Sequence, residues 1–441
     1  MSDTARNSPL TRIVKAATKV EPQELNATLL SFLFVLLLMT AYFIMRPVRD
    51  AMASDWTDAE VSLLWTMTFF FSLIAVSIYG AAISFVRFRW LVPGVYGFFA
   101  VSFFVFYFGS TQIVDPVLVD KSFYVWLSVF SLFHLSVFWS FMSDVFNKNQ
   151  APRLFGIIAT GASVGAIIGP LLAAELVDSI GTDTLMLVSA TLLLIPIPII
   201  FALERLKRTV LGNEDLSVDL SAQQAIGRNP LAGFSLFLQS PYLIGIGCFI
   251  LLYVAIGSFV YFEIKNLFEV FTREERTQIF AYIDFAVNAL AILTAVFVTS
   301  RIATRFGMAT TLALIPALMA IGMLVLAFSP VVAVVAGLQV ARRAGNYAIT
   351  RPGREMLFTV VGRETRFKAK PVIDIVLYRG GDMVSAWAFT LLTSVAGLGL
   401  GAVAAVGAGI ALAWATIGVY LGRAFDRRAV NSDAGLSQER S

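Results

Sequence analysis

The chain has 441 residues, of which 58% are hydrophobic and only 14% carry a charge. Soluble globular proteins have about a quarter of their residues charged, so this composition excludes an ordinary soluble domain and predicts a membrane protein. The single cysteine and the single histidine exclude an internal disulfide and argue against any metal site built from His and Cys.

Stretches of about 20 apolar residues recur along the whole sequence, and each is long enough to cross a bilayer as a helix. Lipid excludes open sheets, and the alternation typical of a membrane barrel is absent from the sequence. We therefore expect an all-α polytopic membrane protein with twelve transmembrane helices. The expected spans are 25–50, 60–86, 90–110, 122–143, 154–177, 184–203, 241–262, 277–300, 308–328, 331–350, 371–396 and 400–421.

The longest break between spans is the polar segment 204–240, which begins ERLKR. We expect it to be a cytoplasmic linker between an N-terminal six-helix half, 25–203, and a C-terminal six-helix half, 241–421. The cytoplasmic tails are then 1–24 and 422–441. Two six-helix halves around a central cavity are typical of the major facilitator architecture.

The basic residues predict the orientation. If both termini are cytoplasmic, 26 of the 33 lysines and arginines lie on the cytoplasmic side, 6 lie on the other side, and Arg379 lies within a span. The positive-inside rule then predicts an N-in, C-in, multi-pass protein of the bacterial inner (cytoplasmic) membrane. This bias also accounts for the net positive charge, so we expect the lipid bilayer as the surroundings, no nucleic-acid partner and no obligate protein partner.

Polar residues in the first, fourth and eighth spans are further candidates. Arg46 and Arg49 are three residues apart near the end of the first span, where they either bind substrate or anchor in lipid headgroups. Asp284 and Asn288 in the eighth span either face the cavity or pack helices together. His134 has no titratable neighbour at helical spacing, so we expect it to be structural.

The fifth span carries a ridge of small residues, Gly161, Gly165 and Gly169, spaced four apart. Such a ridge lets two helix backbones approach closely. We interpret it as a packing surface.

The eleventh span carries charge at depth. An ionised side chain near the bilayer centre costs at least about 2.5–3.5 kcal/mol, so it usually faces a cavity or a partner. At about 1.5 Å per residue, Asp382 lies near the midplane, with Arg379 three residues before it on the same face. One arginine cannot neutralise both Asp374 and Asp382. We expect this group to contact substrate or an ion; a self-neutralised packing pair is the alternative.

The segment NYAITRPGREMLFTVVGRETRFKAKPVIDIVLYRGGD resembles the corresponding segment of the nucleotide transporter family, the ATP/ADP translocases (ATP:ADP antiporters) of plastids and intracellular bacteria. The family's motif residues recur in order as Tyr347, Pro352, Arg354-Glu355-Met356, Lys368-Ala369-Lys370 and Ile373-Asp374. The family's Leu-Arg-x-x-Lys-Asp is similar to Met45-Arg46-x-x-Arg49-Asp50 here. Two positions depart from the family: Arg351 replaces an Asp, and Asp382 replaces a Lys.

This resemblance implies a divergent bacterial branch of that family. It implies a secondary active transporter that works by alternating access and carries a nucleotide or another phosphorylated, anionic small molecule, with ATP/ADP-type exchange as one form. Several guanidinium groups are needed to hold phosphate once water is removed. The expected substrate-binding residues are Arg46, Arg49, Asp50, Asp284, Asn288, Arg343, Arg379 and Asp382. The expected gate residues are Arg354, Glu355, Lys368, Lys370 and Asp374.

Two other readings remain open. The first is a proton-coupled transporter of an unrelated solute, with Asp382, Asp374 or Asp284 as the proton carrier. The second is a non-transporting membrane scaffold or sensor. An enzyme is not expected, because the sequence shows no nucleophile–base pair, metal cluster or phosphate-binding glycine loop. We therefore expect no catalytic residue and no cofactor, and ATP would be cargo rather than fuel.

Overall fold

The computed structural model describes residues 20–86, 88–112, 115–147, 149–213, 232–297, 299–361 and 372–438. The described residues form helices joined by short turns, and none of them lies in a strand. The protein is therefore the all-α, polytopic membrane protein that the composition predicted. Residues 214–231 of the expected linker, and the expected gate residues Lys368 and Lys370, lie outside the described residues.

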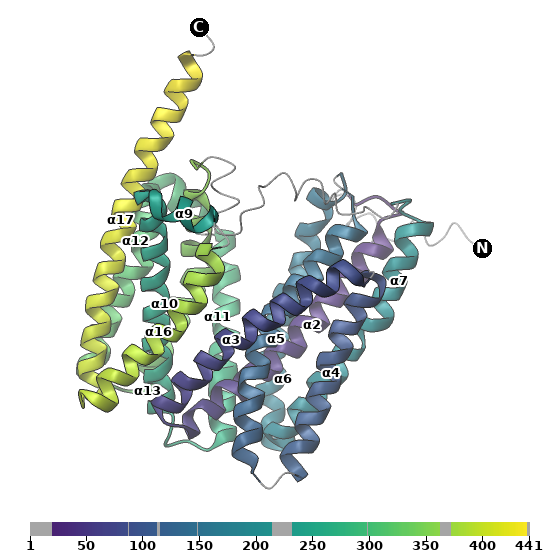
Figure 1. Ribbon diagram of the computed structural model, residues 1–441, viewed down its shortest axis with the longest axis horizontal. Coiled ribbons are helices and arrows are strands. Elements are labelled where there is room, and N and C mark those ends of the chain that lie inside the picture. Colours follow the sequence, from purple (N-terminus) through teal and green to yellow (C-terminus); the bar gives the residue numbers. More distant parts are fainter. Residues whose placement is uncertain are drawn as a thin grey trace. The chain divides into compact units, whose positions relative to one another are not determined.

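The chain divides into two compact units (Figure 1). Unit 1 consists of Met1–Met52, Phe70–Asp219 and Arg273–Phe285. Unit 2 consists of Ala53–Phe69, Leu220–Thr272 and Ala286–Ser441. Each unit thus combines longer stretches from one half of the sequence with a short helical piece from the other half.

In unit 1, long helices lie side by side (Figure 1). They are α2 (Leu25–Met52), α4 (Phe88–Gln112), α5 (Pro116–Val145), α6 (Ala151–Leu194) and α7 (Pro196–Thr209), joined by parts of α3 (Asp58–Phe85) and α11 (Arg273–Phe297). Within α6 the backbone breaks at Gly181, where φ is 76° and ψ is 164°. Only glycine adopts this conformation readily, so α6 consists of two helices that meet at this residue.

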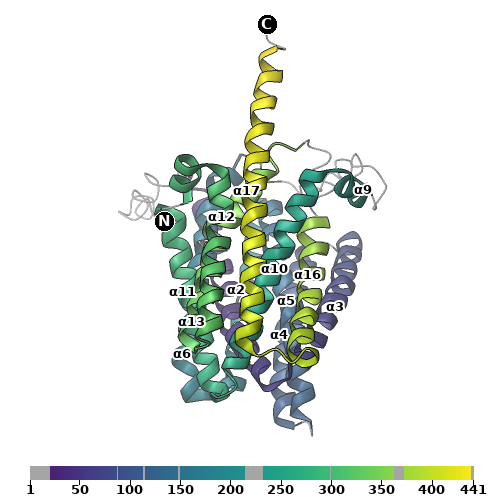
Figure 2. The ribbon, with the colours of Figure 1, turned by 90° about the vertical axis from the view of Figure 1, so that its left-hand side faces the viewer.

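Unit 2 combines long helices with short irregular ones, and α10, α12 and α17 lie next to one another in Figures 1 and 2. Its helices are α9 (Ala232–Gln239), α10 (Pro241–Leu267), α12 (Thr299–Phe328), α13 (Val332–Gly345), α14 (Arg351–Leu357), α16 (Tyr378–Thr390) and α17 (Leu400–Gln438). A 3₁₀ turn, η2 (Ala53–Asp55), precedes α3, and three π-helical turns are η3 (Asn346–Thr350), η4 (Val372–Leu377) and η5 (Leu391–Val395). Turns of the π type concentrate at functional sites.

Nine helical stretches of the described residues are long and apolar enough to cross a membrane. The stretch Arg153–Thr209 contains the break at Gly181 and covers two of the expected spans. The expected spans 331–350 and 371–396 are not among the nine. Each contains a π turn, and their α-helical parts α13 and α16 have 14 and 13 residues.

Large apolar side chains lie on the outside of the helices. On α3, the side chains of Phe70, Phe71, Ile74 and Ile78 are each more than half exposed. Contiguous apolar surface of this kind is costly in water and is expected where helices face lipid. The exposure pattern therefore agrees with a membrane protein.

The predicted glycine ridge packs directly on the backbone of α2. A Cβ added at Gly161 would lie 2.6 Å from the carbonyl oxygen of Phe32, and one at Gly169 would lie 2.7 Å from that of Thr40. At Gly165 it would collide with the carbonyl oxygen of Leu36 and lie 2.9 Å from the Cβ of Met39. The packing interpretation of the ridge is confirmed.

Replacing Gly165 with alanine should therefore destabilise unit 1. The added methyl group forces α2 and α6 apart, and overpacking of this kind costs about 1–3 kcal/mol. Gly156→Ala is the matched control, because a Cβ at Gly156 has no neighbour within 4 Å and alanine favours the helix. A lower Tm for Gly165→Ala, with an unchanged or raised Tm for Gly156→Ala, is the expected result in detergent; equal Tm values would contradict it.

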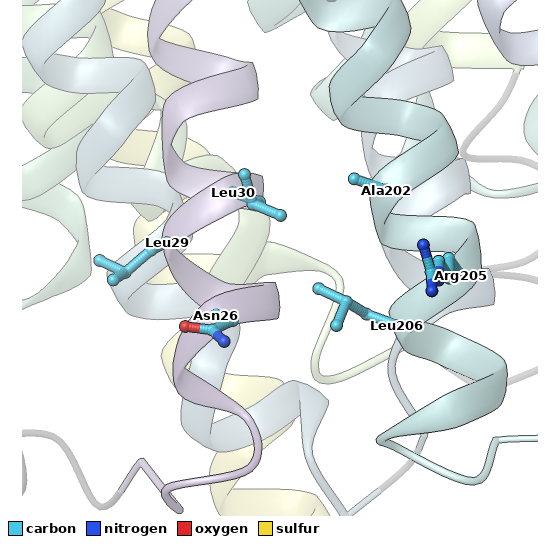
Figure 3. A pocket seen from close by; sticks show the side chains of 6 residues that line it. All are labelled: Asn26, Leu29, Leu30, Ala202, Arg205 and Leu206. Atoms are coloured by element: carbon cyan, nitrogen blue, oxygen red, sulfur yellow. The ribbon is translucent and has the colours of Figure 1, made fainter. Parts of the chain in front are cut away.

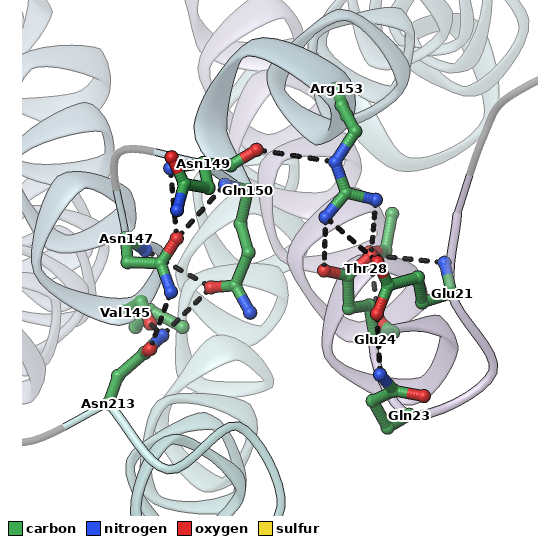
Figure 4. A network of polar contacts seen from close by, with 10 residues as sticks. All are labelled: Glu21, Gln23, Glu24, Thr28, Val145, Asn147, Asn149, Gln150, Arg153 and Asn213. Atoms are coloured by element: carbon green, nitrogen blue, oxygen red, sulfur yellow. Dashed lines mark hydrogen bonds and ion pairs between the residues drawn. The ribbon is translucent and has the colours of Figure 1, made fainter.

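A polar network joins α2, α5, α6 and α7 at one end of unit 1 (Figure 4). Arg153 at the start of α6 donates from both terminal nitrogens to the carboxylate of Glu24, over 3.1 and 2.7 Å. The side-chain amide of Asn213 donates to the carbonyl oxygen of Val145 and to Oε1 of Gln150, both over 2.9 Å. These bonds fix the ends of the four helices relative to one another.

Candidate functional site

Unit 1 contains a group of two arginines and two acids. Arg49 donates from Nε and Nη2 to Oδ1 of Asp50, over 3.0 and 2.6 Å. The Nε of Arg46 lies 3.7 Å from a carboxylate oxygen of Asp50 and 3.7 Å from one of Asp284. The arginine side chains are 16% and 14% exposed, so they lie against acids inside the unit and do not extend outwards as headgroup anchors would. Four of the expected site residues thus come together.

Helix α5 orients this group. Arg49 donates from Nη1 to Oγ of Ser128 over 3.3 Å, and its guanidinium lies 5.5 Å from the ring centre of Tyr124. His134, one turn and a half further along α5, stacks on Tyr42 with 4.3 Å between the ring centres, and it is buried. This packing agrees with a structural role for the histidine. In the group of two arginines and two acids, Arg46 and Arg49 face Asp50 and Asp284, so these four charges balance.

Unit 2 contains a second group, which we name the arginine–tyrosine cluster: Tyr253 on α10, Arg342 on α13, and Tyr378, Arg379 and Asp382 on α16. Arg342 donates from Nη1 to the hydroxyl of Tyr253 over 3.5 Å, and its guanidinium lies 5.8 Å from the centre of that ring. Nη1 of Arg379 lies 3.6 Å from a carboxylate oxygen of Asp382. The ring of Tyr378 lies 6.2 Å from that of Tyr253.

Neighbouring residues fix the position of Arg342. Its Nε and Nη2 donate to Oε1 of Gln339, over 3.3 and 2.9 Å. A Cβ at Gly257 would lie 2.8 Å from Nη1 of Arg342, so the glycine allows the guanidinium to lie against α10. The ring of Trp414 on α17 lies 5.6 Å from that of Tyr253. The guanidinium is thus held by residues of α13 and α10, and Trp414 of α17 packs against the ring of Tyr253.

The charges of the cluster do not balance. Arg342 is buried, while the side chains of Arg379 and Asp382 are 25% and 26% exposed. Among the described side chains of the cluster there are two guanidinium groups and one carboxylate, which leaves a net positive charge beside aromatic rings. Guanidinium groups hold carboxylates and phosphates with paired hydrogen bonds, and aromatic rings supply flat surfaces for a planar ligand.

The remaining expected residues are not members of these two groups. Arg343 is buried on α13, and Arg354 lies 3.5 Å from Glu355 on α14. Asn288 belongs to unit 2, whereas Asp284 belongs to unit 1. Asp374 lies in η4, but its side chain is outside the described part.

Sequence reasoning missed Arg342 and Tyr253. The available signals were a pair of adjacent arginines in an apolar span and the spacing of Tyr253 and Gly257, four residues apart on α10. Neither signal indicates that α10 and α13 meet. Among the described residues, no group of three His, Cys, Asp or Glu side chains is placed to bind a metal.

A hollow of about 490 Å³ lies between α2 and α7 in unit 1 (Figure 3). Most of its lining is aliphatic, and Asn26 and Arg205 contribute its polar groups. It offers a ligand one cation and no aromatic ring. The arginine–tyrosine cluster is the better candidate for binding an anionic solute.

Comparisons with known proteins agree with this architecture. The profile of the Major Facilitator Superfamily matches residues 28–349. The fold is similar to that of a bacterial homolog of the human lysosomal transporter Spinster, with 14% identity, a TM-score of 0.57, and coverage of 93% of this chain and 97% of the other. It is also similar to the nucleoside transporter NupG, with 14% identity, a TM-score of 0.59, and coverage of 91% of this chain and 99% of the other. A search of curated proteins gives no match.

Proposed function

Because the chain belongs to the Major Facilitator Superfamily, we propose that it is a secondary transporter of an anionic, phosphorylated solute, with a nucleotide as the favoured substrate. The observation that carries this proposal is the net positive charge of the arginine–tyrosine cluster. A buried guanidinium is costly without a counter-charge. A phosphate group would supply that counter-charge, and the rings of Tyr253 and Tyr378 would border the base.

Two further observations support a nucleotide. The segment from Asn346 to Asp382 resembles the ATP/ADP translocases, and it includes three of the five cluster residues. One protein of similar fold is a nucleoside transporter. We propose exchange for an internal nucleotide as the mode of transport, with the expected gate residues at the cytoplasmic end.

We also propose the inner-membrane, N-in and C-in orientation, because the distribution of basic residues favours it. Ser217→Cys and Val270→Cys, each in a Cys248→Ser background, would test it. The side chain of Val270 is 83% exposed, after the end of α10. A membrane-impermeant thiol reagent added outside intact cells should label position 270 and leave position 217 unlabelled; the opposite pattern would contradict the orientation.

Replacing Arg342 with lysine should weaken nucleotide binding while preserving the charge. Lysine lacks the planar guanidinium group that donates to Gln339 and Tyr253. It therefore cannot hold a phosphate group with two parallel hydrogen bonds. A hydrogen bond to a charged group contributes about 1.5–3 kcal/mol, so the Kd for ATP should rise roughly 10- to 100-fold. The measurement is the ATP dependence of Tm for the purified protein.

Arg208→Lys is the matched control for this measurement. The side chain of Arg208 is 52% exposed on α7 and pairs with Glu204 over 3.6 Å. The control should bind ATP as the wild type does. If Arg342→Lys also binds ATP with unchanged affinity, the cluster does not hold the phosphates.

A further inference from the structure

Glu263 on α10 is a buried carboxyl group without a visible partner. The residue is 0% exposed, and neither of its side-chain oxygens has a hydrogen-bond partner among the described residues. No sequence pattern singles it out, and the proposed function does not use it. A polar atom buried in this way loses its hydration without replacement.

The charged residues near Glu263 do not balance the negative charge that it would carry if it were ionised. Lys265, two residues later, donates from Nζ to Asp58 at the start of α3 over 3.0 Å and to Asn266 over 2.6 Å. It also lies 3.6 Å from Glu269, in the turn directly after α10. The lysine is therefore already balanced by other acids. Asp58, on another helix, carries a charge of the same sign as an ionised Glu263 and therefore disfavours its ionisation.

Three hydrogen bonds hold the start of α3 against α16 and the π turn η5 that follows it. Asp58 accepts from the hydroxyl of Thr393 over 2.9 Å, and the hydroxyls of Ser62 and Thr390 lie 2.8 Å apart. One turn further along α3, Thr66 accepts from the indole N–H of Trp387 over 2.9 Å. These bonds recur every four residues of α3, so they hold one face of this helix against other elements of unit 2.

The same end of α3 also covers α10 beside Glu263. The ring of Trp65 lies 5.2 Å from the ring of Tyr261 and 5.6 Å from that of Phe262, the residue directly before Glu263. All of these residues belong to unit 2. The burial of Glu263 and the docking of residues 58–66 therefore occur together.

We propose that Glu263 is a proton-binding site, and that its neutral form is required for residues 58–66 of α3 to dock on α10 and α16. An ionised carboxylate without a partner is strongly unfavourable in a buried position, and Asp58 would add repulsion. When the start of α3 leaves α10, water reaches the carboxyl group, its O–H bond breaks and the proton passes to water. Docking again requires the carboxylate to take a proton back from water.

The protonation site itself is independent of the substrate, whereas its use in transport depends on the proposed function. If α3 docks and undocks once in each transport cycle, one proton binds and leaves in each cycle. Transport would then respond to a pH gradient through Glu263, and not through Asp382 or Asp284.

Infrared spectroscopy of the purified protein at neutral pH tests the site without any substrate. The wild type should show the carbonyl stretch of a protonated carboxylic acid in a buried environment, and Glu263→Gln should lose it. Glu269→Gln is the matched control, because that carboxylate lies at the same end of α10 with a side chain 54% exposed, and it should keep the band. A wild-type spectrum without this band, or a band that Glu263→Gln retains, would overturn the proposal.

Transport in liposomes tests the coupling. Glutamine mimics the neutral acid, so Glu263→Gln should exchange nucleotide at equal pH on both sides but lose its stimulation by a pH gradient. Stimulation equal to that of the wild type would overturn the coupling. If no variant transports nucleotide, the proposed function fails, while the infrared result still decides whether Glu263 carries a proton.

Discussion

Replacing Arg379 with alanine is expected to abolish transport, and replacing Asp382 as well is expected not to restore it. In the structure the two side chains lie 3.6 Å apart, three residues apart on α16. Removing either partner leaves the other unpaired, so each single variant should lose stability. The double variant removes both charges and should regain the wild-type Tm. Because we propose that Arg379 also binds the substrate, flux should remain at background in the double variant.

The outcome separates a structural pair from a functional one. A purely structural pair would give a double variant that both folds and transports, and that result would contradict the proposal. Arg208→Ala is the control, because Arg208 also lies 3.6 Å from an acid on its own helix but is exposed on α7. This variant should transport as the wild type does.

Replacing Arg46 or Arg49 with lysine is the second change with a large expected effect. Both arginines are held by Asp50, and Arg46 also faces Asp284. We propose that a phosphorylated substrate competes with these acids for the guanidinium groups. Lysine keeps the charge but loses the paired hydrogen bonds, so the affinity for nucleotide should fall about 10- to 100-fold for each variant.

Arg153→Lys supplies the control in the same unit. Arg153 donates two hydrogen bonds to the carboxylate of Glu24, at the end of unit 1 shown in Figure 4. Its replacement should lower Tm without changing the affinity for nucleotide. If the Arg46 and Arg49 variants behave in the same way as Arg153→Lys, the two arginines only hold the acids in place.

The helical fold could be predicted because it follows from local properties of the sequence. A bilayer requires about 20 apolar residues per crossing, and the breaks at Gly181 and Gly307 fall next to expected span boundaries. The glycine ridge was also predictable, because residues four apart on a helix share a face. The π turns were not, because nothing in the pattern of apolar residues distinguishes a π turn from an α-helical one.

The candidate site was predictable only where its residues are close in sequence. The proximity of Arg379 and Asp382, or of Arg46 and Asp50, follows from helical spacing. The contact between Arg342 and Tyr253 joins residues 89 positions apart, and it depends on how α10 and α13 pack. Glu263 illustrates the same limit, since its lack of a partner is a property of the packed structure.

The most direct test of the proposed function is uptake of labelled ATP into liposomes that contain the purified protein and unlabelled ADP. The account predicts saturable uptake by the wild type that requires internal nucleotide and falls to the level of protein-free liposomes in Arg379→Ala. Wild-type liposomes that bind ATP but take up no more label than protein-free liposomes would contradict it, and would favour a scaffold or sensor instead.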